Sequence, residues 1–362
     1  MKKEPNLTLK TIATRLGVST STVSRVLSGK GAEYRISEQT SKKIYQLVEE
    51  LNFTPNILAR SLRLKKTNTI GLIIPDISNP FFASIAKSVE REARKFGYSI
   101  ILCDTEETTD LEIRALQILR NRKVDGLIIL PVGQNSSHLK KISNRELPIV
   151  IVDRYFNGLN IPYVGSDNYQ GAKEAVKYLI ENGHHRIACI QGLRHTTPGD
   201  DRVKGYIDAH KETKCPIDHS LIVGDNFGEQ NGYIETKLLL KRKPYPSALF
   251  ALSNLISMGA LRAVKEEGLN VPEDISIISF DDQPYSGFLA TPMTTVAQQN
   301  SEMGKIAVKL LFDQMTTKES IENHSVILPT TLIIRKSVQR QVNNYRDKYT
   351  KVINSTEIVT KE

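Results

Sequence analysis

The stretch LKTIATRLGVSTSTVSRVL, residues 9–27, decides the fold of the amino-terminal part of the chain. Its apolar side chains recur at intervals of three and four residues from Leu9 to Leu16, which predicts a helix with one buried stripe. Gly17 ends this stripe, and Ser19 stands at an N-cap position before a second apolar face. The pattern predicts two short helices joined by a tight turn, which is a helix-turn-helix.

The second of these helices exposes small hydroxyl groups and one long cation. Thr20 and Ser21 lie on its leading turn, and Arg25 falls opposite the predicted inward face. Small side chains let a helix approach closely, and an arginine can reach a guanine edge in the major groove, where a bidentate contact discriminates by about 1–3 kcal/mol. We therefore predict a DNA-reading helix. A helical hairpin whose polar face contacts only water is the alternative at this point.

Length and composition favour a globular protein of two or three domains. The chain has 362 residues, of which 40% are hydrophobic and 25% charged. It contains no apolar run near the roughly 20 residues of a membrane helix and no signal-peptide pattern, so we expect a cytoplasmic location. Three scattered cysteines predict neither a disulfide framework nor a metal site; they are Cys103, Cys189 and Cys215.

Positive charge is concentrated at the amino-terminal end. Residues 1–67 carry a net charge of +8, which leaves +1 for the rest of a chain whose total is +9. A solvated basic face is the ordinary explanation of such a cluster. Because this cluster coincides with the helix-turn-helix, neutralisation of DNA phosphates explains it better.

A third helix and a short basic segment complete this part of the chain. Ser37 predicts the start of a helix to Leu51, which closes a head domain over residues 1–53. Residues 54–67 predict a hinge helix of only two or three turns, and isolated helices shorter than about 12–15 residues are marginal in water. We expect this hinge to fold on DNA, with Leu62 as an apolar wedge in the minor groove. A flexible basic linker is the alternative.

From Thr69 onward, short β-branched runs alternate with amphipathic helices. The runs are typical of strands buried on both faces of a parallel sheet: IGLIIP, YSIILCD, VDGLIILP, LPIVIVD, HRIACIQG, PSALFAL and DISIISFD. The helices are expected at 81–96, 110–120, 169–181, 202–213, 229–240, 254–267 and 302–315. This alternation predicts an open, doubly wound α/β architecture in two subdomains, followed by a loose polar tail at 341–362.

The loops after these strands carry polar and aromatic side chains. Ligands of such sheets bind beyond the carboxyl ends of the strands. Carboxylates and an arginine can hydrogen-bond vicinal hydroxyls, and aromatic faces can cover a ring. This combination predicts a site for a small polyhydroxylated ligand such as a sugar, formed by Asn79, Phe81, Phe82, Asp153, Arg202, Phe227, Asn254 and Asp281. Taken one at a time, Asn79, Asn254 and Asp282 are better explained as helix caps.

Ordered motifs give the chain a resemblance to the lactose/galactose-repressor (LacI/GalR) family of bacterial transcription regulators over about 340 residues. They are TLKTIATRLGVSTSTVSRVLSG, FTPNILARSL, IGLIIPDISNPFF, VDGLIIL, ENGHHRIACIQG, DRVKGY, VPEDISIISFDD and LIIRKS. The resemblance implies a homodimer on a pseudo-palindromic operator and a core of the type I periplasmic-binding-protein fold over residues 68–340. It implies an N-subdomain at 68–165 plus 298–328 and a C-subdomain at 166–297 plus 329–340.

The resemblance also implies roles for individual residues. Thr20, Ser21 and Arg25 match base-reading positions, and Leu62 matches the inserted hinge leucine. The complete set expected to bind DNA is Thr8, Ser19, Thr20, Ser21, Thr22, Arg25, Asn56, Ala59, Leu62 and Arg63. Asn254 stands where the family commonly has Asp, Gln299 where it often has Pro, and residues 195–198 lack the basic residue of the purine-binding member. These departures leave the ligand class open, with a sugar favoured over a purine.

The function that these features predict is a ligand-responsive, sequence-specific DNA-binding regulator, most simply a repressor of sugar-metabolism genes. The ligand would choose between two subdomain orientations and so control DNA binding. The alternatives are a solute-binding sugar receptor and a regulator that responds to a nucleobase or other metabolite. The sequence lacks GxGxxG after a strand, a P-loop, GxSxG and HExxH, so we predict no enzyme, no catalytic residue and no cofactor.

Overall fold

The computed structural model describes residues 7–53, 66–143, 147–156, 158–316 and 325–341. The chain divides into two compact units, Met1–Thr67 and Asn68–Glu362. None of the helices within the described residues is long and apolar enough to cross a membrane.

The first unit is a three-helix bundle, as predicted. It consists of α1 (Leu9–Leu16), α2 (Thr20–Leu27) and α3 (Glu38–Glu50). Gly17 ends α1 with φ 63°, a left-handed conformation that glycine adopts without strain. The helices bury a small core of Ile12, Ala13, Val23, Val26, Ile44 and Phe53. The helix-turn-helix prediction is confirmed.

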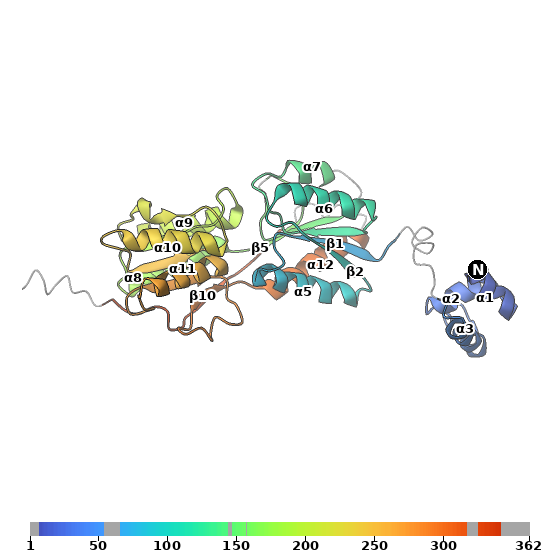
Figure 1. Cartoon of the computed structure of the whole chain (residues 1–362). Coiled ribbons are helices and arrows are strands. Elements are labelled where there is room, and N and C mark those ends of the chain that lie inside the picture. The colour runs from blue at the N-terminus through green and yellow to red at the C-terminus, as the bar shows by residue number, and fades with distance from the viewer. Residues whose placement is uncertain (1–6, 54–65, 144–146, 157, 317–324, 342–362) are drawn as a thin grey trace, which may run out of the picture. The chain divides into compact units, whose positions relative to one another are not determined.

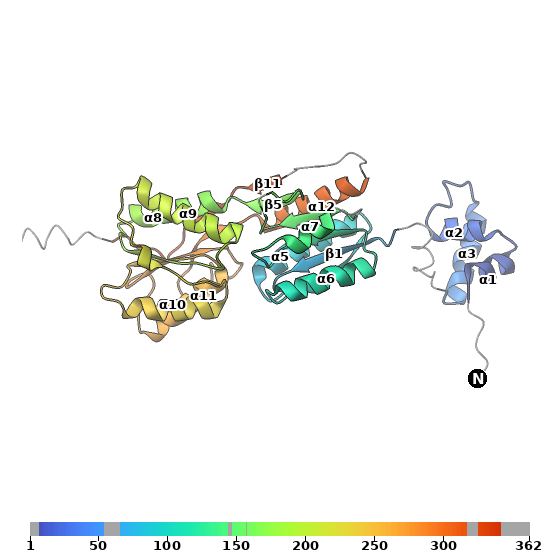
Figure 2. The ribbon, with the colours of Figure 1, turned by 90° about the horizontal axis from the view of Figure 1, so that it is seen from above.

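The second unit contains two six-stranded sheets, each sandwiched between helices (Figures 1 and 2). The first sheet has the order β11 (Ser325–Leu328), β5 (Tyr163–Ser166), β4 (Ile149–Val152), β3 (Gly126–Ile129), β1 (Thr69–Ile74) and β2 (Ser99–Asp104). The second has the order β12 (Thr331–Ile333), β10 (Thr294–Ala297), β9 (Ser276–Phe280), β8 (Ala248–Ala251), β6 (Ile187–Ile190) and β7 (Ile222–Val223). All described pairings are parallel except that of β10 with β12, so the doubly wound α/β prediction is confirmed.

Helices cover both faces of each sheet. The first sheet packs against α5 (Pro80–Lys95) and α12 (Asn300–Thr316) on one face and against α6 (Thr109–Asn121) and α7 (Ser137–Ser143) on the other. The second packs against α8 (Asn168–Glu181) and α9 (Thr197–Glu212), and against α10 (Glu229–Lys241) and α11 (Asn254–Glu266). We call each sheet with its helices the first half and the second half of this unit.

The chain passes between the two halves three times. The passages lie between β5 and α8, between β10 and α12, and between β11 and β12. The last two strands therefore belong to different halves: β11 pairs with β5 in the first half, and β12 pairs with β10 in the second. Neither half is a continuous piece of sequence.

Three details differ from the sequence-based expectations. The run YSIILCD forms β2, which is partly exposed along its length and not buried on both faces, because it is an edge strand paired only with β1. The strand β5, the helix α7 and the short β7 were not foreseen. Helix α9 begins at Thr197, so Arg202 lies within a helix and not in the preceding loop.

Candidate functional site

The predicted reading face of α2 is open in the first unit. Thr20, Ser21 and Arg25 are exposed. The guanidinium of Arg25 lies 4.0 Å from the centre of the Tyr34 ring, a cation–π contact that holds the arginine against the loop after α2.

Two of the hydroxyl residues assigned to DNA contacts are helix caps. The side chain of Thr8 accepts a hydrogen bond from the backbone N–H of Thr11, and Ser19 Oγ accepts one from the N–H of Thr22 at 3.0 Å. The hydroxyls of Ser21 and Thr22 lie 2.7 and 2.8 Å from Ser19 Oγ. These bonds fix where each helix begins. Among the predicted hinge contacts, Asn56, Ala59, Leu62 and Arg63 lie outside the described residues.

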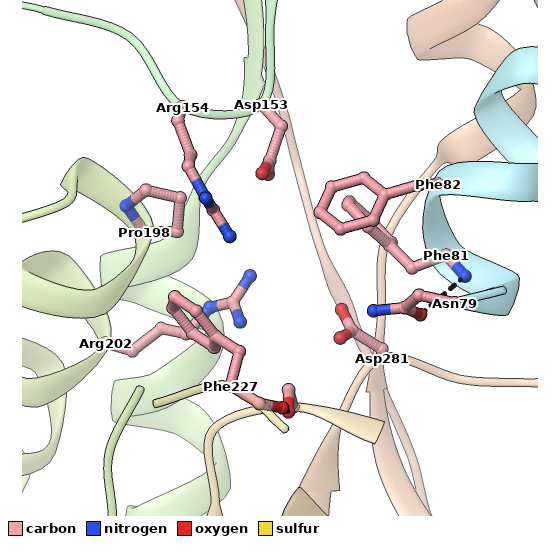
Figure 3. Close-up of a pocket in the computed structure, with 10 residues that line it drawn as sticks. Asn79, Phe81, Phe82, Asp153, Arg154, Pro198, Arg202, Phe227 and Asp281 are labelled. Carbon is pink, nitrogen blue, oxygen red and sulfur yellow. Dashed lines mark hydrogen bonds between the residues drawn. The ribbon is translucent and has the colours of Figure 1, made fainter. Parts of the chain in front are cut away.

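A cavity of about 340 Å³, part of it open to solvent, lies in the second unit where the carboxyl ends of the two sheets face each other (Figure 3). It is lined by Asn79, Phe81, Phe82, Asp153, Arg154, Pro198, Arg202, Phe227, Ser253 and Asp281. The structure therefore brings seven of the eight predicted ligand residues together. Asn254 lies beside the cavity next to Ser253, and Arg154, Pro198 and Ser253 were not foreseen.

Two aspartates hold corresponding positions in the two halves. Asp153 directly follows β4 and Asp281 directly follows β9, with φ values of 69° and 70°. The backbone N–H of each donates to a neighbouring strand, to Val164 O and Val296 O respectively, at 2.9 Å. These left-handed conformations turn the chain at the strand end and aim both side chains into the cavity.

Burial dominates the electrostatics of both carboxyl groups. Burial raises the pKa of Asp153 to about 6, although Arg154 and Arg202 oppose this shift. Burial likewise raises the pKa of Asp281, opposed by Arg202 and by a hydrogen bond of 2.5 Å from Gln298 Nε2 to Asp281 Oδ1. Asp153 Oδ1 is buried and has no hydrogen-bond partner among the described residues.

The two arginines are anchored by the protein itself. Arg202 donates from Nε to Asn168 Oδ1 at 2.8 Å and from Nη1 to Leu252 O at 2.6 Å, and its guanidinium lies 3.7 Å from the centre of the Phe280 ring. Burial lowers its pKa. Arg154 forms two hydrogen bonds with Glu107, of 2.7 and 2.9 Å. Each guanidinium keeps N–H groups that are free of these bonds.

Aromatic rings close the cavity from both halves. Phe81 and Phe82 begin α5 and meet edge to face with their centroids 5.1 Å apart. Phe227 comes from the second half. The centre of its ring lies 5.2 Å from the guanidinium of Arg154, which belongs to the first half. Figure 3 shows Phe82 and Phe227 on opposite sides of the charged groups. The arrangement offers apolar faces to a ring and charged hydrogen-bonding groups to its edge.

Comparison with known proteins identifies the family. The description "Bacterial regulatory proteins, lacI family" matches residues 8–56, and "Periplasmic binding proteins and sugar binding domain of LacI family" matches residues 67–336, more than half of the chain. The chain belongs to the LacI family. As a LacI-family member it is a DNA-binding transcriptional regulator that responds to a ligand, and not a free-standing solute receptor.

The LacI-family relatives of this chain carry different names. The chain is 35% identical over 93% of its length to the ribose operon repressor of Halalkalibacterium halodurans, covering 98% of that protein. It is 33% identical over 92% of its length to the HTH-type transcriptional repressor PurR of Pasteurella multocida, covering 99% of that protein. Among solved structures, the complex of the regulator CelR with cellobiose matches 92% of this chain and 100% of that one, with 29% identity and a TM-score of 0.70. The family alone therefore leaves the ligand undecided.

Proposed function

We propose that this LacI-family regulator is a repressor that binds a pseudo-palindromic operator as a homodimer, and that its effector is a small, uncharged sugar bound in the cavity of the second unit. The observation that carries the effector assignment is Asp153. Its carboxylate lines the cavity, and its Oδ1 is buried without a partner among the described residues. Buried polar atoms are nearly always hydrogen-bonded, and a hydroxyl group of a bound ligand would supply the missing donor.

Further acceptors beside the cavity support a ligand rich in hydroxyl groups. Asn254 Oδ1 and Gln298 Oε1 are also buried without partners in the described part of the chain. Both residues contact Asp281, which lines the cavity. The unpaired oxygen of Asp153 at the cavity, with Asp281 as a second lining carboxylate, favours a ligand with several O–H or N–H donors. A sugar supplies a donor at almost every carbon, whereas a purine supplies few.

One relative and the aromatic lining of the cavity support a monosaccharide. The similarity to a ribose operon repressor supports a pentose within this class. The rings of Phe81, Phe82 and Phe227 would cover the faces of the sugar, as aromatic side chains cover apolar C–H surfaces.

Ligand binding would act through the two halves of the unit. The cavity takes walls from both halves, so a bound sugar favours the arrangement in which they close on it. This choice would reach DNA through residues 54–67, which connect the unit to the helix-turn-helix. Thr20, Ser21 and Arg25 would read bases, and Leu62 would enter the minor groove.

Thermal-shift measurements on the full-length protein test the effector assignment. Pentoses, hexoses and nucleobases are compared, because a ligand of the folded state stabilises it by about 2.7 kcal/mol at 100 times its Kd. We expect a pentose to raise Tm in the wild type and not in Asp153→Ala. A nucleobase that raises Tm where all sugars fail would overturn the assignment.

A second measurement tests the output. A fluorescent operator selected from random duplex DNA is titrated with protein, with and without the stabilising sugar. The proposal predicts a sequence preference and an affinity that changes with the sugar. An operator affinity that is the same with and without sugar contradicts control by this ligand.

A further inference from the structure

Glu107 sits outside the cavity but fixes the charge of one of its walls. It lies in the turn between β2 and α6, and its side chain is 36% exposed. Its two carboxylate oxygens accept hydrogen bonds from Nη1 and Nη2 of Arg154 at 2.7 and 2.9 Å, while the Arg154 side chain is only 4% exposed. This geometry is the bidentate pairing that arginine and carboxylates favour.

The surroundings of Arg154 contain no surplus positive charge. Arg154 also donates to the carbonyl oxygen of Val132 at 2.9 Å. The cavity and this pair together hold three carboxylates, Glu107, Asp153 and Asp281, against two guanidiniums, Arg154 and Arg202. Glu107 is the carboxylate that turns an even balance of charges into an excess of negative ones.

A phosphorylated ligand would enter such a site at a high cost. A phosphate monoester carries about −1.5 to −2 charges at pH 7 and needs cationic partners when it leaves water. Arg154 is one of the two arginines that line the cavity, and Glu107 already accepts two hydrogen bonds from it. A neutral sugar needs only the N–H groups that the pair leaves free.

We propose that Glu107 is a specificity-determining residue of the effector site: by pairing with Arg154, it restricts the cavity to uncharged sugars and excludes their phosphate esters. This inference rests on the proposed sugar function and adds which form of the sugar is sensed. The site would discriminate because a phosphate ester meets unfavourable charges in it, and not because the free sugar gains an additional contact.

The matched pair Glu107→Gln and Glu106→Gln tests the proposal. Both substitutions remove one negative charge from the same turn, but Glu106 is exposed and only Glu107 pairs with Arg154. The glutamine at 107 still offers an oxygen to the guanidinium. Binding of D-ribose, D-ribose 5-phosphate and inorganic phosphate to the full-length proteins is measured by calorimetry, with circular dichroism to verify the fold.

We expect the wild type and Glu106→Gln to prefer the free sugar strongly. In Glu107→Gln the ratio of the two affinities should shift towards the phosphate ester by about tenfold or more, equivalent to 1.4 kcal/mol. The double variant Glu107→Gln with Arg154→Gln, which leaves no buried unpaired cation, should lose this gain. An unchanged ratio in Glu107→Gln, or a wild type that binds the ester as tightly as the sugar, overturns the proposal.

Inorganic phosphate separates this proposal from the sugar assignment. If no neutral sugar binds the wild type, the sugar assignment fails. The phosphate titration still decides the role of Glu107. Phosphate binding gained in Glu107→Gln and absent in Glu106→Gln supports charge exclusion, whereas no gain in either variant refutes it.

Discussion

The side-chain amide of Asn254 donates a hydrogen bond of 3.2 Å to Oδ1 of Asn79, and this bond joins the two halves of the ligand-binding unit. Asn254 begins α11 in the second half, and Asn79 caps α5 in the first, where its Oδ1 also accepts the N–H of Phe81 at 3.1 Å. Both asparagines are buried. Asn79 therefore is a helix cap, as its position alone indicates, and also one partner in a hydrogen bond between the two halves at the cavity.

Loss of this bond should weaken the closed arrangement. Asn254→Ala is expected to lower effector affinity by about two- to tenfold, since one buried hydrogen bond contributes about 0.5–1.5 kcal/mol. Asn231→Ala is the control, because Asn231 donates to Gln191 O at 3.1 Å within the second half. Calorimetry with the effector measures both. Equal affinities in the two variants would show that the bond between the halves does not stabilise the bound state.

Asp153 should make the stability of the protein depend on pH. Its pKa is raised from 3.8 to about 6, so the folded state binds a proton more tightly than the unfolded chain. Stability is therefore lost as pH rises from about 4 to 6, by about 3 kcal/mol in total. Asp153→Asn should remove this loss and be more stable than the wild type at pH 7 but not at pH 4. Urea unfolding across this pH range measures the difference.

The same group should couple sugar binding to pH. An ionised carboxylate accepts two hydroxyl donors, so ligand binding favours the deprotonated form of Asp153 and releases a proton. Effector affinity is expected to rise between pH 5 and pH 7 and then to level off, as measured by calorimetry in two buffers of different ionisation enthalpy. An affinity independent of pH across this range would exclude direct binding by Asp153.

Arg25 should determine base preference and not general DNA affinity. Arg25→Ala is expected to relax selection at one position in each half-site, a loss of about 1–3 kcal/mol of discrimination there. Arg15, an exposed cation on α1, provides the control Arg15→Ala. Selection from random DNA followed by sequencing compares the two. Unchanged preference in Arg25→Ala would remove its assigned role.

Leu62 is the residue through which the proposed role of the hinge, residues 54–67, can be tested. Leu62→Ala should reduce affinity for the specific operator while the salt-dependent binding to random DNA stays nearly constant, because an apolar wedge adds no phosphate contact. Titrations at several salt concentrations separate the two kinds of binding. A parallel decrease in both would point to a basic linker in place of a wedge.

Sequence patterns predicted the parts of this molecule that depend on local residue order. Gly17 and Ser19 mark the turn of the helix-turn-helix because their roles, a left-handed end and an N-cap, are properties of single residues. The buried strands could also be predicted, because continuous runs of β-branched residues are typical of strands that are buried on both faces of a sheet. The sequence of β2 resembles that of the other strands, but the strand is partly exposed. Its place at the edge of the sheet depends on the topology, which the local sequence does not show.

The cavity was predicted less completely, for a geometric reason. Successive side chains of a regular strand point to opposite faces, so a residue next to Asp153 is expected to point away from it. The φ of 69° at Asp153 breaks this alternation, and Arg154 lines the same cavity. The salt bridge between Arg154 and Glu107 joins residues that are 47 positions apart in the sequence, so a local sequence pattern does not predict it.

The three passages of the chain between the halves have a consequence for synthesis on the ribosome. The first half needs α12 and β11, and the second needs β12, so the first sheet is finished only when residues 325–328 have been made and the second only when residues 331–333 have been made. A chain that stops before residue 325 would consequently leave both sheets incomplete, and such products would present unpaired strand edges that favour aggregation and degradation.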